Sequence, residues 1–207
     1  MNVQSKHQVN LTIKIKDFLR VVVIALTVAI ILRLFIIEPR YIPSGSMEPT
    51  LQVNDRILVD KISPRWRPLQ RGEIIVFYPP ANPHKAYIKR LIALGGDRVA
   101  VHDGKVMVNG QILQEDYIAE APEYDLPEIT VPKGYLWVMG DNRNNSNDSH
   151  VWGFLAEKNV IGRAILRFYP IDQRLGLLKN PLADFFSPVK MAISPSPPAP
   201  LPQGEGS

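Results

Sequence analysis

The sequence has 207 residues, enough for one domain together with an anchor and a tail. It contains no cysteine, which excludes disulfides, thiol catalysis and cysteine-ligated metal sites. The formal net charge is only +4, and residues 1–20 carry four basic residues against one acidic residue, so the rest of the chain lacks the basic surface expected of a general nucleic-acid-binding protein.

The N-terminal part of the chain has the pattern of a membrane anchor. Residues 1–17 are polar and basic and are expected to form a cytoplasmic tail. Residues 18–37, FLRVVVIALTVAIILRLFII, predict a transmembrane helix. A cleaved secretory signal is the competing interpretation, but no small-residue cleavage site follows the segment. Basic residues are more frequent before the segment than soon after it, which predicts a cytoplasmic N-terminus and an outward-facing domain.

Residues 38–186 have the pattern of a mostly β, antiparallel sheet domain. Short runs of β-branched and aromatic residues alternate there with Gly, Pro, Asn and Asp turns. The predicted strands cover residues 56–59, 73–78, 86–94, 99–102, 105–108, 111–113, 135–139 and 161–170. The pairs Asp103-Gly104 and Asn109-Gly110 are the strongest hairpin signals, because such pairs favour the positive φ angles of tight turns.

Three segments are expected to be irregular. Residues 62–71 form a basic loop in which Trp66 is expected to touch lipid headgroups. Residues 114–130 are acidic and are expected to form a surface loop. Residues 187–207 are rich in proline and serine, which predicts a disordered tail.

A short stretch directly after the apolar segment carries two serines around a glycine. Ser44, Gly45 and Ser46 lie between Pro43 and Pro49, so the stretch cannot continue a helix. A bent backbone here would present a hydroxyl next to free N–H groups, as a serine nucleophile and its oxyanion site require. The plain alternative is a linker between the membrane segment and the domain.

A serine nucleophile needs a base, and the histidines are poor candidates. They are found on the cytoplasmic side, in a proline-flanked loop, at a hairpin turn and after a polar loop, and each is interpreted as a surface residue: His7, His84, His102 and His150. A buried lysine is the other option, because desolvation lowers the pKa of its amine.

Lys89 fits this second option, because it lies within an apolar predicted strand. Alternation places Lys89 on the face of Tyr87 and Leu91, and Arg90 on the opposite face. The alternative is that Lys89 and Arg90 merely reach solvent from an edge strand. From the strand alone, both interpretations stay open.

Four segments in order closely resemble the successive motif boxes of the type I signal peptidases. They are residues 44–51 (SGSMEPTL), 71–77 (RGEIIVF), 87–97 (YIKRLIALGGD) and 140–149 (GDNRNNSNDS). The resemblance extends from the anchor to about residue 170.

This resemblance implies a Ser-Lys dyad, with Ser46 as the nucleophile and Lys89 as the general base. It further implies that the Ser44 hydroxyl and the Ser46 backbone N–H form the oxyanion site, and that Ser146 orients the lysine amine. Structural supports of the last motif are implied at Asp141, Arg143 and Asp148. A substrate groove that admits alanine-sized side chains is implied at Ile42, Pro43, Met47, Tyr87 and Ile88. No cofactor is implied.

The activity implied by the resemblance is that of a membrane-bound serine endopeptidase that cleaves N-terminal signal peptides from exported preproteins after small residues. Its partners would be signal peptides, membrane lipid and a nearby export translocon, without nucleic acid, at a plasma or thylakoid membrane. Two alternatives stay open: a membrane-anchored β-domain that only binds signal peptides, and a self-cleaving Ser-Lys regulator. The regulator would need a DNA-binding module where this chain has its apolar segment.

Two residues depart from the family pattern. Asn144 stands where many members have an acid, and His150 where many have an arginine, so neutral hydrogen bonds are expected in place of salt bridges in this loop. The stretch between Asp97 and Gly140 is short, which predicts a compact catalytic core without a large inserted cap.

Overall fold

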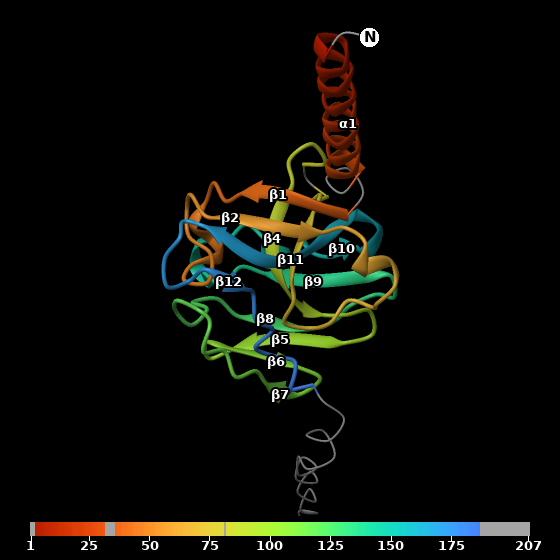
Figure 1. Cartoon of the computed structure of the whole chain (residues 1–207). Helices are drawn as coiled ribbons and strands as arrows, with labels where there is room; N and C mark the ends of the chain where they lie inside the picture. The colour runs from red at the N-terminus through yellow and green to blue at the C-terminus, as the bar shows by residue number, and fades with distance from the viewer. Residues whose placement is uncertain (1–2, 32–35, 81, 187–207) are drawn as a thin grey trace, which may run out of the picture.

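The computed structural model describes residues 3–31, 36–80 and 82–186. Figure 1 shows helix α1 at one end of a β-rich domain, close to strand β1. The helices are α1 (Val3–Ile31) and α2 (Ser149–Trp152), with 3-10 turns η2 (Gly45–Met47), η3 (Ser63–Arg65), η4 (Arg143–Asn145) and η5 (Glu157–Asn159). The strands are β1 (Ile37–Tyr41), β2 (Arg56–Asp60), β3 (Ile74–Phe77), β4 (Tyr87–Ala93), β5 (Arg98–His102), β6 (Lys105–Val108), β7 (Gln111–Ile112), β8 (Leu126–Thr130), β9 (Tyr135–Met139), β10 (Leu155–Ala156), β11 (Val160–Tyr169) and β12 (Gly176–Leu177).

The strands form two sheets. The larger sheet has the order β1-β2-β11-β3-β4-β9-β10, with β12 paired to β11, and the smaller has the order β7-β6-β5-β8. The pairs are antiparallel in both sheets. The prediction of a mostly β, antiparallel domain is therefore confirmed.

The smaller sheet is formed by residues 98–130. They belong to the short stretch between Asp97 and Gly140, in which no large inserted cap was expected. Its hairpins turn at Asp103-Gly104 and Asn109-Gly110, as predicted, and all four residues have φ between 49° and 78°. The tight turns fix the β5–β6 register, which pairs His102 with Lys105.

The expectation that residues 114–130 form a surface loop is wrong for the last five residues. Leu126–Thr130 is strand β8, which pairs with β5. The sequence signal was weak because β8 contains Pro127, which cannot donate a ladder hydrogen bond. Strand β1 contains Pro39 and was likewise not predicted. Both strands lie at the edge of a sheet, where one side of the backbone needs no partner.

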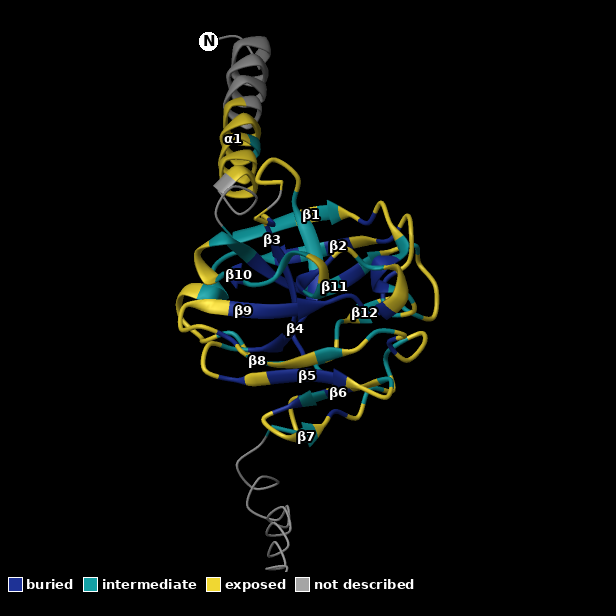
Figure 2. Cartoon of the chain, turned by 180° about the vertical axis from the view of Figure 1, so that it is seen from behind, coloured by how far each residue is buried: buried dark blue, intermediate teal, exposed yellow. Residues whose placement is uncertain are grey.

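A shared core joins the two sheets. Ile92 and Trp137 of the larger sheet pack in one cluster with Val99, Val101 and Val108 of the smaller sheet. Figure 2 shows β9 and the middle of β5 as buried strands facing this interior. Because neither sheet covers this face alone, the two sheets are expected to fold as one unit.

The predicted membrane segment is not found as one element. Its first part lies in α1, residues 32–35 are outside the described residues, and Ile37 already belongs to β1. Among the helices of the described residues, none meets the combined length and apolarity needed to span a bilayer. Helix α1 also takes in most of the expected tail at residues 1–17, because it begins at Val3. The predicted tail at 187–207 lies outside the described residues.

The shared core makes a testable prediction for Val101→Ala. Val101 is 1% exposed, and the substitution should lower the free energy of unfolding by roughly 1–3 kcal/mol through lost burial and an unfilled cavity. Chemical denaturation followed by tryptophan fluorescence and by circular dichroism should give one coincident transition. The same substitution at Val53, which is 44% exposed, should have a much smaller effect. Two separate transitions would contradict the shared core.

Candidate active site

Ser46 lies on a 3-10 turn that is anchored in the core. The turn η2 is preceded by Ser44 in an extended conformation, and Ser46 itself is only 9% exposed. Ile42 and Met47, on either side, are buried in the same hydrophobic cluster and fix the turn to the larger sheet. The first N–H groups of such a turn have no partner within it, so the Ser46 amide is available to an external acceptor.

Lys89 meets Ser46 from the neighbouring strand β4. Its Nζ lies 2.5 Å from Ser46 Oγ, within hydrogen-bond distance. Lys89 is 4% exposed, and this burial lowers the pKa of its amine to about 8, although Asp148 and Asp141 act in the opposite direction. Of the two interpretations left open for this lysine, the structure therefore supports the buried one.

The loop after β9 holds the nucleophile turn in place. The Asn142 backbone N–H donates to Ser46 O over 3.1 Å, and its side-chain amide donates to Gly45 O over 3.2 Å. Gly140 allows this close approach, because a Cβ there would lie 2.4 Å from Ser46 O and 2.3 Å from Ser146 Oγ. Only a residue without a side chain fits between the two loops.

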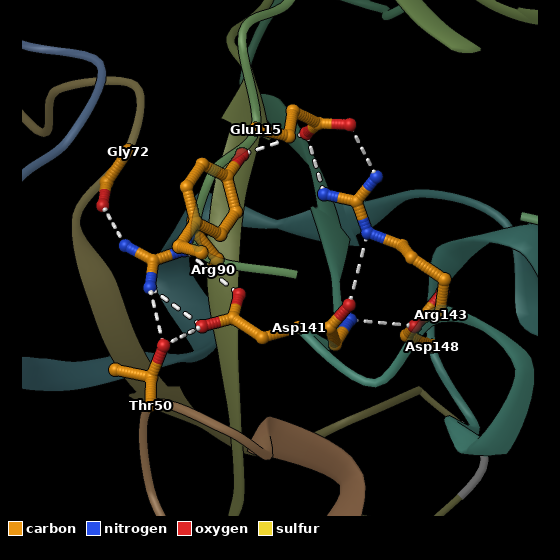
Figure 3. A network of polar contacts seen from close by, with 9 residues as sticks. Thr50, Gly72, Arg90, Glu115, Asp141, Arg143 and Asp148 are labelled. Atoms are coloured by element: carbon orange, nitrogen blue, oxygen red, sulfur yellow. Dashed lines mark hydrogen bonds and ion pairs between the residues drawn. The ribbon is translucent and has the colours of Figure 1, made fainter. Parts of the chain in front are cut away.

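Arg90, the residue after Lys89, forms a buried ion pair (Figure 3). Its guanidinium donates to both carboxylate oxygens of Asp141, over 2.8 and 2.6 Å, and to Gly72 O over 2.7 Å. The Thr50 hydroxyl donates to the same carboxylate over 2.6 Å. This ion pair therefore ties strand β4, the nucleophile segment and the loop after β9 together.

Arg143 makes a second buried ion pair, also seen in Figure 3. Its guanidinium donates to both oxygens of Glu115, over 2.7 and 2.6 Å, and to Gly140 O over 3.1 Å. The Tyr117 ring lies 4.2 Å from the Arg90 guanidinium, and the Tyr117 hydroxyl donates to Glu115. The two ion pairs are thus connected through one aromatic ring.

Asp148 is the third buried carboxylate of the site. It accepts from the Gly140 backbone N–H over 2.7 Å and from the Ser146 hydroxyl over 2.5 Å. It also accepts from the His150 backbone N–H over 3.2 Å, and the His150 ring Nδ1 lies 2.8 Å away. Within the described residues, no hydrogen bond joins Ser146 to Lys89. The hydroxyl implied to orient the lysine uses its proton to donate to Asp148, which leaves its oxygen lone pairs as acceptors.

A groove of about 320 Å³ opens over the dyad. It is lined by Pro43, Ser44, Gly45, Ser46, Lys85, Ala86, Tyr87, Ile88, Lys89, Asn145 and Asn147. Three of the implied groove residues, Pro43, Tyr87 and Ile88, therefore line it. Ile42 and Met47 do not, because both side chains are packed in the core beneath the turn.

Several residues that build the site were not predicted from the sequence. Arg90 and Asn142 stand inside two of the motifs and could have been suspected for that reason. Glu115 and Tyr117 lie in the acidic stretch that was expected to be a surface loop, and no local signal marks their burial. Among the described residues, no group of three or more His, Cys, Asp or Glu side chains is arranged to hold a metal ion.

This chain is similar to several known peptidases. A model of the family "Signal peptidase, peptidase S26" matches residues 15–169. The probable signal peptidase I-1 of Synechocystis sp. is 53% identical over 166 residues, which cover 77% of this chain and 85% of that protein. Thylakoidal processing peptidase 1, chloroplastic, of Arabidopsis thaliana is 40% identical over 156 residues, 70% of this chain and 46% of that protein. A solved signal peptidase I from Enterococcus faecalis is 35% identical, with a TM-score of 0.44, over 47% of this chain and 97% of that chain.

The buried lysine predicts a specific pH dependence of stability. Its pKa falls from an ordinary 10.5 to about 8 on folding, so between these values the folded state binds fewer protons than the unfolded state. The free energy of unfolding should therefore rise from pH 8 to pH 10.5, by up to about 3 kcal/mol from this residue. Urea unfolding of Lys89→Met should lack that rise, whereas Lys105→Met, which removes an exposed lysine of β6, should retain it. Equal pH dependence in Lys89→Met and the unmodified chain would show that Lys89 is not desolvated.

Proposed function

Because the chain belongs to the signal peptidase family, peptidase S26, we propose that it is a membrane-bound serine endopeptidase that removes N-terminal signal peptides from exported preproteins. The observation that carries the proposal is the contact between Lys89 Nζ and Ser46 Oγ at the floor of an open groove. A hydroxyl beside a desolvated amine meets the requirement for a nucleophile with its own base, without a histidine or a metal ion.

In the first half of the reaction, the neutral Lys89 amine takes the proton of the Ser46 hydroxyl as Oγ attacks the scissile carbonyl carbon. The carbonyl oxygen becomes an anion, which accepts hydrogen bonds from the Ser44 hydroxyl and the Ser46 backbone N–H. Lys89 then gives its proton to the leaving nitrogen, and the C–N bond breaks. The mature protein departs with a new amino terminus, and the signal peptide remains esterified to Ser46.

In the second half, Lys89 takes a proton from a water molecule as the water oxygen attacks the ester carbon. The anion that forms is stabilised by the same two donors. The C–O bond to Ser46 then breaks, and the proton held by Lys89 returns to the Ser46 oxygen. The signal peptide leaves with a new carboxyl group, and the dyad is restored.

The groove is suited to an extended peptide with small side chains. Strand β4 pairs with β3 through Tyr87 and Lys89, but its pairing with β9 begins only at Arg90. The other edge of residues 87–89 is therefore open to an added strand, whose backbone would hydrogen-bond to β4. Pro43 and Ile88 line the groove and limit the size of the side chains near the scissile bond.

Residues 1–17 are assigned to the cytoplasm, 18–37 to a single membrane span whose last residue also begins strand β1, 38–186 to the catalytic domain and 187–207 to a tail. The apolar character of residues 18–37 and the basic residues before them support this orientation. Signal peptides are then the substrates, with membrane lipid and an export translocon nearby. Because the relatives include a probable signal peptidase of Synechocystis sp. and a thylakoidal processing peptidase of Arabidopsis thaliana, a plasma membrane and a thylakoid membrane are the two settings to compare.

The direct test is cleavage of a preprotein by the detergent-solubilised full chain. Ser46→Ala and Lys89→Ala should each abolish cleavage without unfolding the domain, whereas Lys105→Ala should leave it unchanged. Near-normal turnover by Lys89→Ala would refute the dyad. Binding of the preprotein without a new N-terminus would favour a signal-peptide-binding domain, and cleavage confined to the chain itself would favour a self-cleaving regulator.

The pH profile supplies an independent test of the base. Only the neutral amine accepts the Ser46 proton, so kcat/KM should rise with pH and level off above a midpoint near 8, the pKa to which burial lowers Lys89. The measurement is the initial rate of preprotein cleavage from pH 5.5 to pH 10. A midpoint near 6.5, the ordinary value for imidazole, would point to a histidine base instead.

A further inference from the structure

The three buried carboxylates around the dyad differ in how their charge is compensated. Asp141 receives two hydrogen bonds from Arg90, and Glu115 receives two from Arg143. No arginine or lysine forms an ion pair with Asp148 within the part of the chain that the structure describes. The ionisable side chain in contact with its carboxylate is His150.

His150 is held between two partners. Its Nδ1 lies 2.8 Å from Asp148 Oδ1, within hydrogen-bond distance, and in the tautomer with the proton on Nδ1 the ring donates to the carboxylate. On its other side the ring stacks on Tyr124, with centroids 4.2 Å apart and planes inclined by 14°. Asn144 fixes the Tyr124 segment, since its amide accepts from the Glu123 N–H and donates to Ala121 O. The ring is therefore confined to one orientation towards Asp148.

Few other charges act on this contact. Glu123 precedes Tyr124 on the segment that stacks on the ring, and it is exposed to solvent. Asp148, Arg143 and Glu115 all act on Tyr124, and Arg143 and Glu115 form an ion pair with each other. The carboxylate in direct contact with the ring is that of Asp148, the N-cap of helix α2.

We propose that His150 is a positioning residue for the general base: its imidazole contacts Asp148 and orients that carboxylate, whose negative charge acts on Lys89. This inference rests on the proposed function for its effect on catalysis, although its electrostatic part concerns only the folded chain. The Oδ1 contact with His150 leaves Oδ2 for the Gly140 N–H and the Ser146 hydroxyl. His150 therefore acts both on the geometry of the loop and on the charge near the amine.

The charge at position 150 determines in which direction the pKa of Lys89 changes. Asp148 favours the ammonium form of Lys89, which works against the effect of burial on its pKa. A permanent cation at position 150 would offset the Asp148 charge and make the neutral amine easier to form. An uncharged donor at that position would leave the balance as it is.

The experiment compares His150→Arg with His150→Gln in the full chain. NMR of lysines labelled at Cε, with the Lys89 signal assigned by its loss in Lys89→Met, reports the titration of Lys89 without requiring cleavage. In His150→Arg the midpoint should fall by on the order of half a pH unit, and the acid limb of kcat/KM should move with it. At pH 7 this corresponds to a roughly threefold higher rate. In His150→Gln both midpoints should stay within about 0.2 pH unit of the unmodified chain, because the amide keeps an N–H donor without a charge.

A matched control is His102→Arg, which makes the same change in charge on the smaller sheet. His102 also lies near two carboxylates, 3.4 Å from Asp103 and 3.6 Å from Asp125, but its side chain is 68% exposed. This variant should leave the Lys89 titration unchanged. His150→Ala, which removes the donor, should lower kcat with little change in KM, and His150→Gln should restore it.

The outcomes separate this inference from the proposed function. If Lys89 titrates identically in the unmodified chain and His150→Arg, or shifts equally in His102→Arg, the inference is overturned whether or not the chain cleaves preproteins. A shift confined to His150→Arg in a chain without peptidase activity would support the electrostatic inference and overturn the proposed function.

Discussion

The whole site depends on keeping one lysine amine out of water next to a serine hydroxyl. Burial is the largest effect on Lys89, and it acts against the charged form. Burial can keep the pKa of the Lys89 amine low only to the extent that nearby carboxylates, which favour the ammonium form, are compensated. Asp148 and Asp141 do act in that direction, although Arg90 pairs with Asp141. Arg143 pairs with Glu115. Part of the polar structure beneath the groove can therefore be understood as compensation of negative charge near the base.

The same interactions also hold distant parts of the chain together. Thr50 and Asp141 are joined by a hydrogen bond across 91 positions of sequence, and Asn142 and Gly45 across 97. A bidentate arginine fixes both the distance and the orientation of its partner, which a lysine would not do. Geometry and electrostatics at the site thus have a common origin in a few arginine–carboxylate pairs.

The sequence predicted the features that local patterns determine. The central strands alternate apolar residues between turn signals, and the Asp-Gly and Asn-Gly hairpins could be identified from two residues each. Strands β1 and β8 could not, because each contains a proline that only an edge position tolerates, and edge position is a property of the assembled sheet.

The residues of the site could likewise be predicted only where a local sequence pattern marks them. Ser46 and Lys89 became candidates because a hydroxyl in a bend and a lysine in an apolar strand are unusual locally, but only the resemblance of four segments to family motifs implied their roles. Glu115 was missed because its partner Arg143 lies 28 residues away, and only the folded chain brings the two side chains together. Ile42 and Met47 were assigned to the groove from a motif, but a motif gives no information on which way a side chain points.

Because these contacts join residues that lie far apart in sequence, the Ser46–Lys89 pair can react only after the chain has folded. In an unfolded chain the lysine is solvated and charged, and the serine has neither a base nor fixed donors. The nucleophile turn, strand β4 and the loop after β9 are far apart in sequence and meet in the folded chain. Completion of the fold is thus itself the activation step, and a partly synthesised chain lacking that loop carries an inert serine.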